Sequence, residues 1–140
     1  MKKTMKITFA WLVLMLGLMG CQEEYRVQLA SDSETISQAS FAINDLDENR
    51  VTKVHTIRVY NQREALVWHL RRDTLMVDTG LNGFQYGATP RGFEAVVPAI
   101  DLEPGAAYTV VVQGRGYGVL RFAANSSGKL VHLGHKPSGF

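Results

Sequence analysis

The sequence predicts an all-β protein built around one small β-sandwich, and three observations carry this prediction. Beyond residue 20, the 140-residue chain has about seven or eight short segments of alternating or β-branched apolar residues, which turn residues separate. No long segment in that part has the helical period of about 3.6 residues. No repeat of fixed length occurs either. This pattern is typical of an all-β sandwich or barrel.

The first 20 residues have the three parts of a secretory signal peptide. Lys2, Lys3 and Lys6 form a positively charged start, and an apolar stretch of about 14 residues runs from Ile7 to Gly20, a small residue. That stretch is short for a membrane-spanning helix, which needs about 20 residues. An uncleaved anchor or an ordinary buried helix is the alternative.

The tetrapeptide Leu18-Met19-Gly20-Cys21 closes the apolar stretch and contains the only cysteine. It resembles the lipobox of bacterial lipoproteins, although that family more often has Ala, Ser, Thr or Val where Met19 stands. The resemblance implies cleavage before Cys21, lipid on its sulfur, and a membrane anchor. Because Gln22 replaces the Asp that often retains lipoproteins in the inner membrane, it favours the outer membrane, facing the periplasm, in a Gram-negative host. In a Gram-positive host it implies the outer leaflet of the only membrane.

Removal of residues 1–20 changes the charge balance. The whole chain has 15 basic and 13 acidic residues, and loss of the three signal lysines leaves 12 basic residues against 13 acidic ones. The basic isoelectric point is therefore a property of the signal, and the composition gives no indication of nucleic-acid binding. Lipidation of the only thiol excludes disulfides, cysteine nucleophiles and thiolate metal sites. The remaining chain is long enough for one domain, which its hydrophobic core must stabilise.

The rest of the chain divides into three parts. Residues 21–49 are polar and are predicted as a tether with a candidate strand over 25–29. The sandwich domain is predicted over 50–134, and residues 135–140 as a flexible tail. Its strands are predicted over 51–60, 65–70, 74–77, 93–97, 107–113, 117–123 and 130–133. Gly114-Arg115-Gly116 predicts a tight hairpin turn between the two longest of the later strands.

A stretch before one of these strands, Leu102-Glu103-Pro104-Gly105-Ala106-Ala107-Tyr108-Thr109-Val110, resembles the Leu-x-Pro-Gly-x-x-Tyr-x-Val entry to strand F of fibronectin type III domains. The resemblance implies an immunoglobulin-like sandwich in which Tyr108 is a corner residue, its ring in the core and its hydroxyl bonded to nearby backbone, with Leu102 buried beside it. Ala65-Leu66-Val67-Trp68 is similar to the strand that bears the core tryptophan of that family. Such modules mostly bind other molecules or act as spacers. Transthyretin-like and other bacterial lipoprotein sandwiches remain alternatives.

The sequence predicts no catalytic site, no metal site and no cofactor. The spacing of the four histidines does not define a zinc site: His55, His69, His132 and His135. No Gly-x-Ser-x-Gly motif is present. Four carboxylates are candidates for a glycosidase pair, but strand ends and surfaces explain them as easily: Asp73, Asp78, Glu94 and Asp101.

The glycine-rich segment over 80–92 is the candidate binding element. Phe84 and Tyr86 would present flat apolar area to a partner, and Arg91 would contact an anion. In the alternative, the aromatic rings fold back onto the core and the glycines only permit the turn. A second candidate is a basic patch for phosphates or carboxylates, with solvated surface charges as its alternative: Arg71, Arg72, Arg115 and Arg121.

These observations predict an envelope lipoprotein that acts as a non-enzymatic binding or accessory module, with an envelope protein or a glycan as its partner. One alternative is an inhibitor or immunity lipoprotein that inserts the 80–92 segment into the cleft of a secreted hydrolase. The other is a periplasmic enzyme or metal-binding protein, which needs histidines and carboxylates that converge in a cleft.

Overall fold

The computed structural model describes residues 23–30, 35–47 and 50–133, so the predicted signal peptide, Cys21 and the predicted tail lie outside the described residues. The described residues form nine strands and one short 3₁₀ helix, η1 (Ile36–Gln38). The strands are β1 (Glu23–Leu29), β2 (Ser40–Asp45), β3 (Val54–Asn61), β4 (Leu66–Arg72), β5 (Gly83–Gln85), β6 (Phe93–Val97), β7 (Ala107–Gly114), β8 (Gly116–Ala124) and β9 (Leu130–His132). This composition confirms the predicted all-β, sandwich-like fold.

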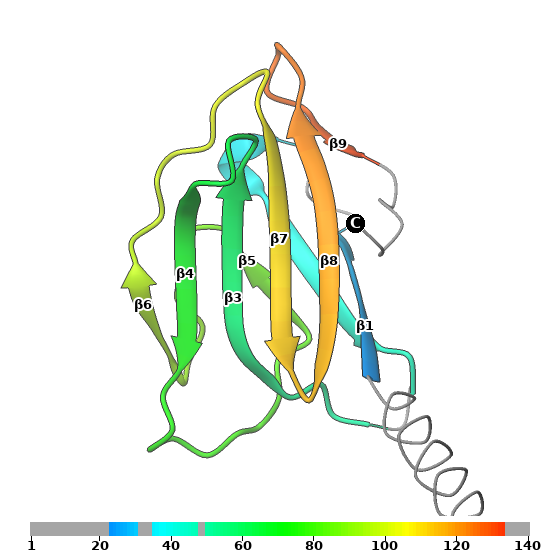
Figure 1. Ribbon diagram of the computed structural model, residues 1–140, viewed down its shortest axis with the longest axis vertical. Coiled ribbons are helices and arrows are strands. Elements are labelled where there is room, and N and C mark those ends of the chain that lie inside the picture. Colours follow the sequence, from blue (N-terminus) through cyan, green and yellow to red (C-terminus); the bar gives the residue numbers. More distant parts are fainter. Residues whose placement is uncertain (1–22, 31–34, 48–49, 134–140) are drawn as a thin grey trace, which may run out of the picture.

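The strands form one curled sheet in the order β5-β2-β1-β8-β7-β3-β4-β6, and β9 pairs with β8. The sheet folds over where β1 meets β8, because these strands share only two residue pairs, Glu23–Gly116 and Glu24–Tyr117. Two layers face each other as a result. The larger layer, β6-β4-β3-β7-β8, lies in front in Figure 1, and the smaller layer, β1-β2-β5, lies behind it.

The close approach of the layers depends on a glycine. Gly118 is a buried position of β8, and a Cβ atom there would lie 2.8 Å from the carbonyl oxygen of Tyr25 and 2.8 Å from a methyl carbon of Val27. Real Cβ atoms do not come so close to backbone oxygens. Glycine at this position therefore allows β1 to cross directly over the start of β8.

A chain of aromatic rings joins the two layers inside the core. The ring of Phe41 on β2 lies 4.9 Å from that of Phe84 on β5 and 5.3 Å from that of Phe122 on β8, measured between centroids. Trp68 on β4 lies 6.0 Å from Phe84 and 4.9 Å from Tyr86. Each such pair adds about 0.5–1.5 kcal/mol to the apolar area that it buries. These contacts connect the layers without any disulfide.

The region over 21–49 contains the candidate strand that the sequence predicted over 25–29, within β1, and more strand than a tether would have. Its described part contributes β1 and β2, which pair from Tyr25–Asp45 to Leu29–Phe41. Phe41 and Ile43 of β2 are almost completely buried. The domain therefore starts with β1 and not at residue 50. The physical reason is that the larger layer would otherwise expose its apolar inner face to water.

Two further segments differ from their predictions. Residues 74–77, predicted as a strand, belong to the exposed loop between β4 and β5. The segment over 80–92, predicted as a loop, contains β5, which pairs with β2 through Phe84–Phe41 and its neighbours. The hairpin predicted around Arg115 is confirmed, since β7 and β8 pair over seven positions on either side of it.

Candidate functional site

The predicted core residues lie inside the sandwich. Trp68, Leu102 and Tyr108 are 1%, 8% and 5% exposed. The hydroxyl of Tyr108 accepts a hydrogen bond of 2.8 Å from the backbone N–H of Glu103, which is the contact of a tyrosine corner. Its ring stacks on Phe122 at 5.5 Å. Trp68 lies on β4, and β3 separates it from the strand that carries Tyr108.

The aromatic residues of the 80–92 segment face the core. Phe84 is 7% exposed, and its ring stacks on Phe41. Tyr86 is half-buried, packs edge-on against Trp68, and donates its hydroxyl hydrogen to the carbonyl oxygen of Ile100 at 2.5 Å. Burial, followed by the proximity of Tyr108 and Asp101, raises the pKa of Tyr86 to about 12. Both rings therefore pack inward, as in the second of the two interpretations of this segment. Neither ring offers a flat apolar surface to a partner.

Arg91, the third predicted binding residue, is exposed. It belongs to the turn that precedes β6, and the backbone N–H of Phe93 donates to the carbonyl oxygen of Pro90 in that turn. A binding role for Arg91 stays a prediction. Of the three predicted binding residues, Arg91 is the one that the structure leaves exposed.

The histidines do not form a metal site among the described residues, where no group of three or more potential ligands occurs. His69 pairs with Arg58 of β3 and stands two residues before Arg71 on its own strand, and its Nε2 atom is buried without a hydrogen-bond partner within the described region. Burial, together with these two arginines, lowers the pKa of His69. The ring is therefore favoured in its neutral form, and His135 lies outside the described residues.

The acidic candidates for catalysis have structural partners. Glu94 accepts hydrogen bonds from the guanidinium of Arg71, including one of 3.0 Å from Nε. Asp78 lies 3.7 Å from the guanidinium of Arg72. Asp73 accepts a 2.9 Å bond from the backbone N–H of a residue in its own turn. These contacts explain three of the four carboxylates as charges at strand ends and loops.

The predicted basic patch divides between different surfaces. Arg71 and Arg121 lie on the outside of the larger layer, and Arg71 is paired with Glu94. Arg72 pairs with Asp78 beyond the end of β4, and Arg115 occupies the turn between β7 and β8. The four arginines that the sequence grouped therefore do not form one patch.

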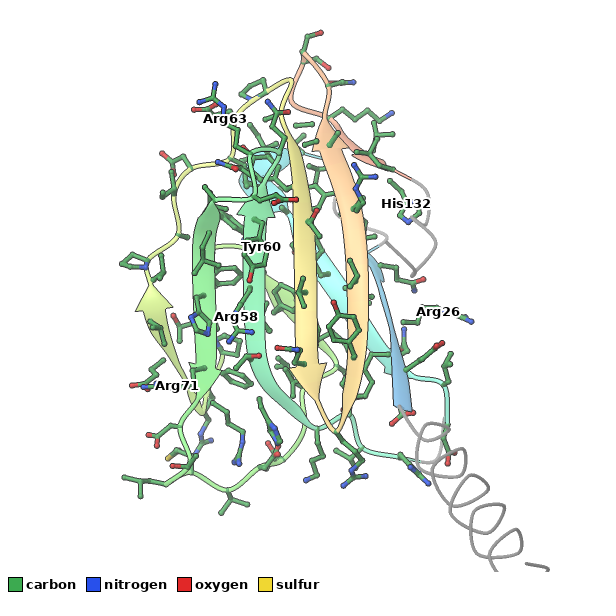
Figure 2. All side chains as sticks on the ribbon, viewed as in Figure 1. Arg26, Arg58, Tyr60, Arg63, Arg71 and His132 are labelled. Atoms are coloured by element: carbon green, nitrogen blue, oxygen red, sulfur yellow. The ribbon has the colours of Figure 1, made fainter. Side chains whose placement is uncertain are left out.

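The outside of the larger layer is a different and more coherent surface, which we call the outer face. Figure 1 shows no element in front of it, and Figure 2 shows Arg58, Tyr60 and Arg71 on it. Cross-strand registers place its residues side by side. They are Thr56, Arg58 and Tyr60 of β3, His69 and Arg71 of β4, Thr109, Val111 and Gln113 of β7, and Tyr117, Val119 and Arg121 of β8.

The outer face has an apolar centre and a polar border. Val111 pairs with Val119 on one side and with Arg58 on the other. The guanidinium of Arg58 donates to the side-chain oxygen of Gln113 at 2.8 Å, which fixes its position above the sheet. Tyr117 is 46% exposed. Arginine and tyrosine are enriched in protein-binding surfaces, and here they surround the two valines.

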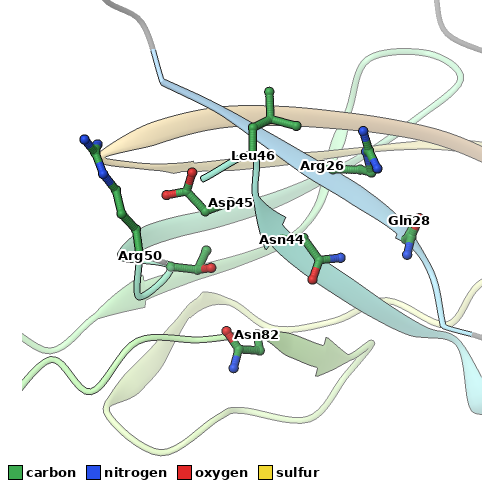
Figure 3. Close-up of a pocket in the computed structure, with 8 residues that line it drawn as sticks. Arg26, Gln28, Asn44, Asp45, Leu46, Arg50 and Asn82 are labelled. Carbon is green, nitrogen blue, oxygen red and sulfur yellow. The ribbon is translucent and has the colours of Figure 1, made fainter. Parts of the chain in front are cut away.

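A second candidate is a polar hollow on the smaller layer. Its volume is about 540 Å³. Figure 3 shows the side chains that line it, which come from β1, from β2 and the loop after it, and from Asn82 just before β5. One oxygen of Asp45 is buried there without a hydrogen-bond partner within the described region. Its lining is polar apart from Leu46: Arg26, Gln28, Asn44, Asp45, Arg50, Thr52 and Asn82. Its arginine and amide groups can form hydrogen bonds with a polar ligand, but no aromatic ring lines it.

Sequence reasoning missed both surfaces for the same reason. Each depends on which strands are neighbours, and that information is not local in sequence. The alternation within each strand identifies the outward residues, such as Thr109 and Val111 of β7, but not their partners on β3. For the hollow, Asn44 and Asp45 fall in the stretch that the sequence predicts as a tether, although they end β2.

Within the described residues, no helix has the length and apolar character needed to cross a membrane. Comparison with protein-family models, with curated proteins and with solved structures finds no match for this chain.

Proposed function

We propose that the protein is a lipid-anchored envelope lipoprotein that acts as a non-enzymatic binding or accessory module. In this proposal, lipid on Cys21 anchors it, and the outer face binds an envelope protein. In a Gram-negative host the proposed site is the outer membrane, facing the periplasm. The single observation that supports the binding role is the uncovered outer face with its apolar centre and its border of arginine and tyrosine residues.

The lipobox supports the anchor, and the start of the fold agrees with it. Strand β1 begins at Glu23, two residues after Cys21. A signal peptidase that cuts before Cys21 would therefore leave every strand of the sandwich intact. The mature chain would begin directly at the folded domain.

Strand order supports the resemblance to immunoglobulin-like and fibronectin type III modules. One layer contains β1-β2-β5 and the other contains β3-β7-β8, which corresponds to strands A-B-E and C-F-G of such sandwiches. Tyr108 stands at the start of β7, as the corner tyrosine stands at the start of strand F. Trp68 departs from the pattern, because it lies on β4 and not on β3, the strand that corresponds to C.

The anchor is tested by metabolic labelling with a fatty acid in cells that express the full chain. We expect label in the wild-type protein and none in Cys21→Ser, because the thioether needs the cysteine sulfur. Label that persists in Cys21→Ser would contradict the assignment.

The binding role is tested by photo-crosslinking in cells. A benzoylphenylalanine in place of Tyr117 on the outer face is expected to capture one dominant envelope protein. The same group in place of Gln28, on the smaller layer, is the matched control. Capture only from position 28 would move the binding site to the polar hollow, and recovery of glycan fragments alone would replace the protein partner with a cell-wall ligand.

A charge-reversal pair sharpens the test. Arg121→Glu and Arg26→Glu each reverse an exposed arginine on a strand, one on the outer face and one on the smaller layer. We expect Arg121→Glu to abolish capture and Arg26→Glu to leave it intact, while both proteins melt like the wild type.

A further inference from the structure

Exposed apolar side chains gather at one end of the sandwich. In the loop between β4 and β5, Leu75 is 93% exposed, Met76 41% and Val77 87%. In the neighbouring loop between β2 and β3, Leu46 is 54% exposed and Val51 53%. An apolar group of this size on the surface of a soluble domain usually marks an interaction site.

The two loops touch each other. The backbone N–H of Leu81 donates to the carbonyl oxygen of Thr52 at 2.9 Å. A side chain at Gly80 would collide with a methyl group of Val51. Val51 therefore lies beside the loop that carries Leu75, Met76 and Val77, and we call the surface of these four residues the apolar end.

The apolar end is the end at which β1 begins. Glu23 pairs with Gly116 at the start of β8, and Gly114 at the end of β7 pairs with Val54 at the start of β3. The end of β4 lies beside them, because Thr56 of β3 pairs with Arg71. Figure 1 shows the start of β1, the turn between β7 and β8 and the loop after β4 at the same end of the molecule.

The loop that carries Leu75 is held in a defined turn. A carboxylate oxygen of Asp73 accepts from the N–H of Leu75 at 2.9 Å, and the N–H of Met76 donates to the carbonyl oxygen of Asp73 at 3.2 Å. Its backbone is therefore fixed while its apolar side chains remain in solvent. This arrangement does not bury them against any described part of the chain.

Several charged groups around the apolar end have partners. Asp47 lies 3.1 Å from Arg50, and Asp78 lies 3.7 Å from Arg72. The ammonium group of Lys53 donates to the backbone carbonyl of Asp78 at 2.7 Å. Paired charges neither repel an anionic surface strongly nor leave an isolated carboxylate to be desolvated.

We propose that the apolar end docks on the bilayer that carries the anchor, with Leu75, Met76 and Val77 at the boundary between headgroups and acyl chains. This inference rests on the proposed lipid at Cys21. Only Gln22 separates Cys21 from Glu23, and an extended chain spans at most about 3.6 Å per residue, so the Cα atom of Cys21 lies within about 7 Å of the start of β1. The end of the sandwich that faces the membrane is then the apolar end, where side chains of this kind insert into the interface.

The test uses the full lipidated protein in lipid vesicles. Leu75→Cys, Val77→Cys and, at the opposite end, Ser126→Cys each receive an environment-sensitive fluorophore, because lipidation leaves the introduced thiol as the only free one. Nitroxide-labelled phospholipids then report membrane depth by quenching. We expect a blue shift and loss of most of the fluorescence at positions 75 and 77, and neither effect at 126.

Charge substitutions provide the matched control. With the fluorophore on Met76→Cys, the double variant Leu75→Glu/Val77→Glu is expected to abolish quenching. Ile100→Glu, which places one glutamate on an apolar residue that is 59% exposed at the opposite end, is expected to leave it unchanged.

The outcomes separate this inference from the proposed anchor. Mass spectrometry that finds no lipid on Cys21 removes the anchor, and the docking with it. Lipid on Cys21 with no quenching at 75 and 77 overturns the docking alone, and capture of a protein from position 75 would then assign the apolar end to a protein partner. Equal quenching at 75 and 126 also overturns it, because the sandwich would have no fixed orientation.

Discussion

Tyr108 offers the sharpest test of the core, because its ring and its hydroxyl contribute separately. Tyr108→Phe removes the hydrogen bond from the N–H of Glu103 and keeps the stack on Phe122. Glu103 is exposed, so water can replace the lost acceptor. The expected loss is therefore the net value of one hydrogen bond, about 1 kcal/mol.

Tyr108→Ala removes the ring as well and leaves a cavity. The side chain is 5% exposed, and truncation of a buried aromatic residue costs about 3–5 kcal/mol. Together with the hydrogen bond, we expect a loss of about 4–6 kcal/mol. A domain of this size has a stability of about 5–15 kcal/mol, so the alanine variant is expected to lie close to the limit of folding.

Urea denaturation of the chain from residue 21, with Cys21→Ser, measures both losses from the midpoint at constant slope. A loss below about 1 kcal/mol for Tyr108→Ala would refute the assignment of Tyr108 to the core. A loss of about 3 kcal/mol or more for Tyr108→Phe would refute the reasoning about solvent access, because it would mean that the N–H of Glu103 stays buried and unpaired.

Three further predictions concern a glycine and two titrating groups. Gly118→Ala is expected to cost about 1–3 kcal/mol in the same urea assay, because its Cβ must displace the backbone of β1 at Tyr25; a neutral effect would mean that β1 does not cross there. The raised pKa of Tyr86 predicts that the free energy of unfolding falls as pH rises from about 10 to about 12, since the unfolded tyrosine ionises first. Tyr86→Phe should flatten that dependence, and a wild-type curve without it would contradict the burial of the hydroxyl. The lowered pKa of His69 predicts falling stability as pH drops below about 6.5, where the unfolded chain takes up the proton first. His69→Gln should weaken this fall, and a pKa measured by NMR above 6.5 would contradict the effect of burial, Arg58 and Arg71.

The β7–β8 hairpin was predictable because its information is local. Tyr108, Val110 and Val112 fall on one face of an unbroken β-branched segment, and two glycines flank Arg115 in the turn. A one-residue connection leaves the strands no choice of partner. Alternation within one short segment also predicted β6, with the bounds that the structure shows, Phe93–Val97.

Strand β2 was not predictable in this way. Its inward residues Phe41 and Ile43 keep the alternation, but Ser40, Asn44 and Asp45 point outward or end the strand, and they have the composition of a loop. The strand exists because β1 and β5 flank it and the larger layer needs a cover. Tertiary context here overrides weak strand propensity.

The segment over 74–77 shows the opposite error. Thr74 and Val77 are β-branched and favour extended backbone, which predicted a strand. A strand also needs a neighbour, and β6 already occupies the free edge of β4. The apolar residues therefore remain in an exposed loop, and their exposure is what defines the apolar end.

Docking and partner binding would use different parts of the same fold without interference. The strands of the larger layer run from the apolar end to the opposite end (Figure 1), so a sandwich that rests on its apolar end would hold the outer face roughly upright on the membrane. A partner would then approach Val111 and Val119 from the side, within the envelope space. Leu75→Glu/Val77→Glu should change this orientation and leave partner binding in detergent intact, whereas Arg121→Glu should do the reverse.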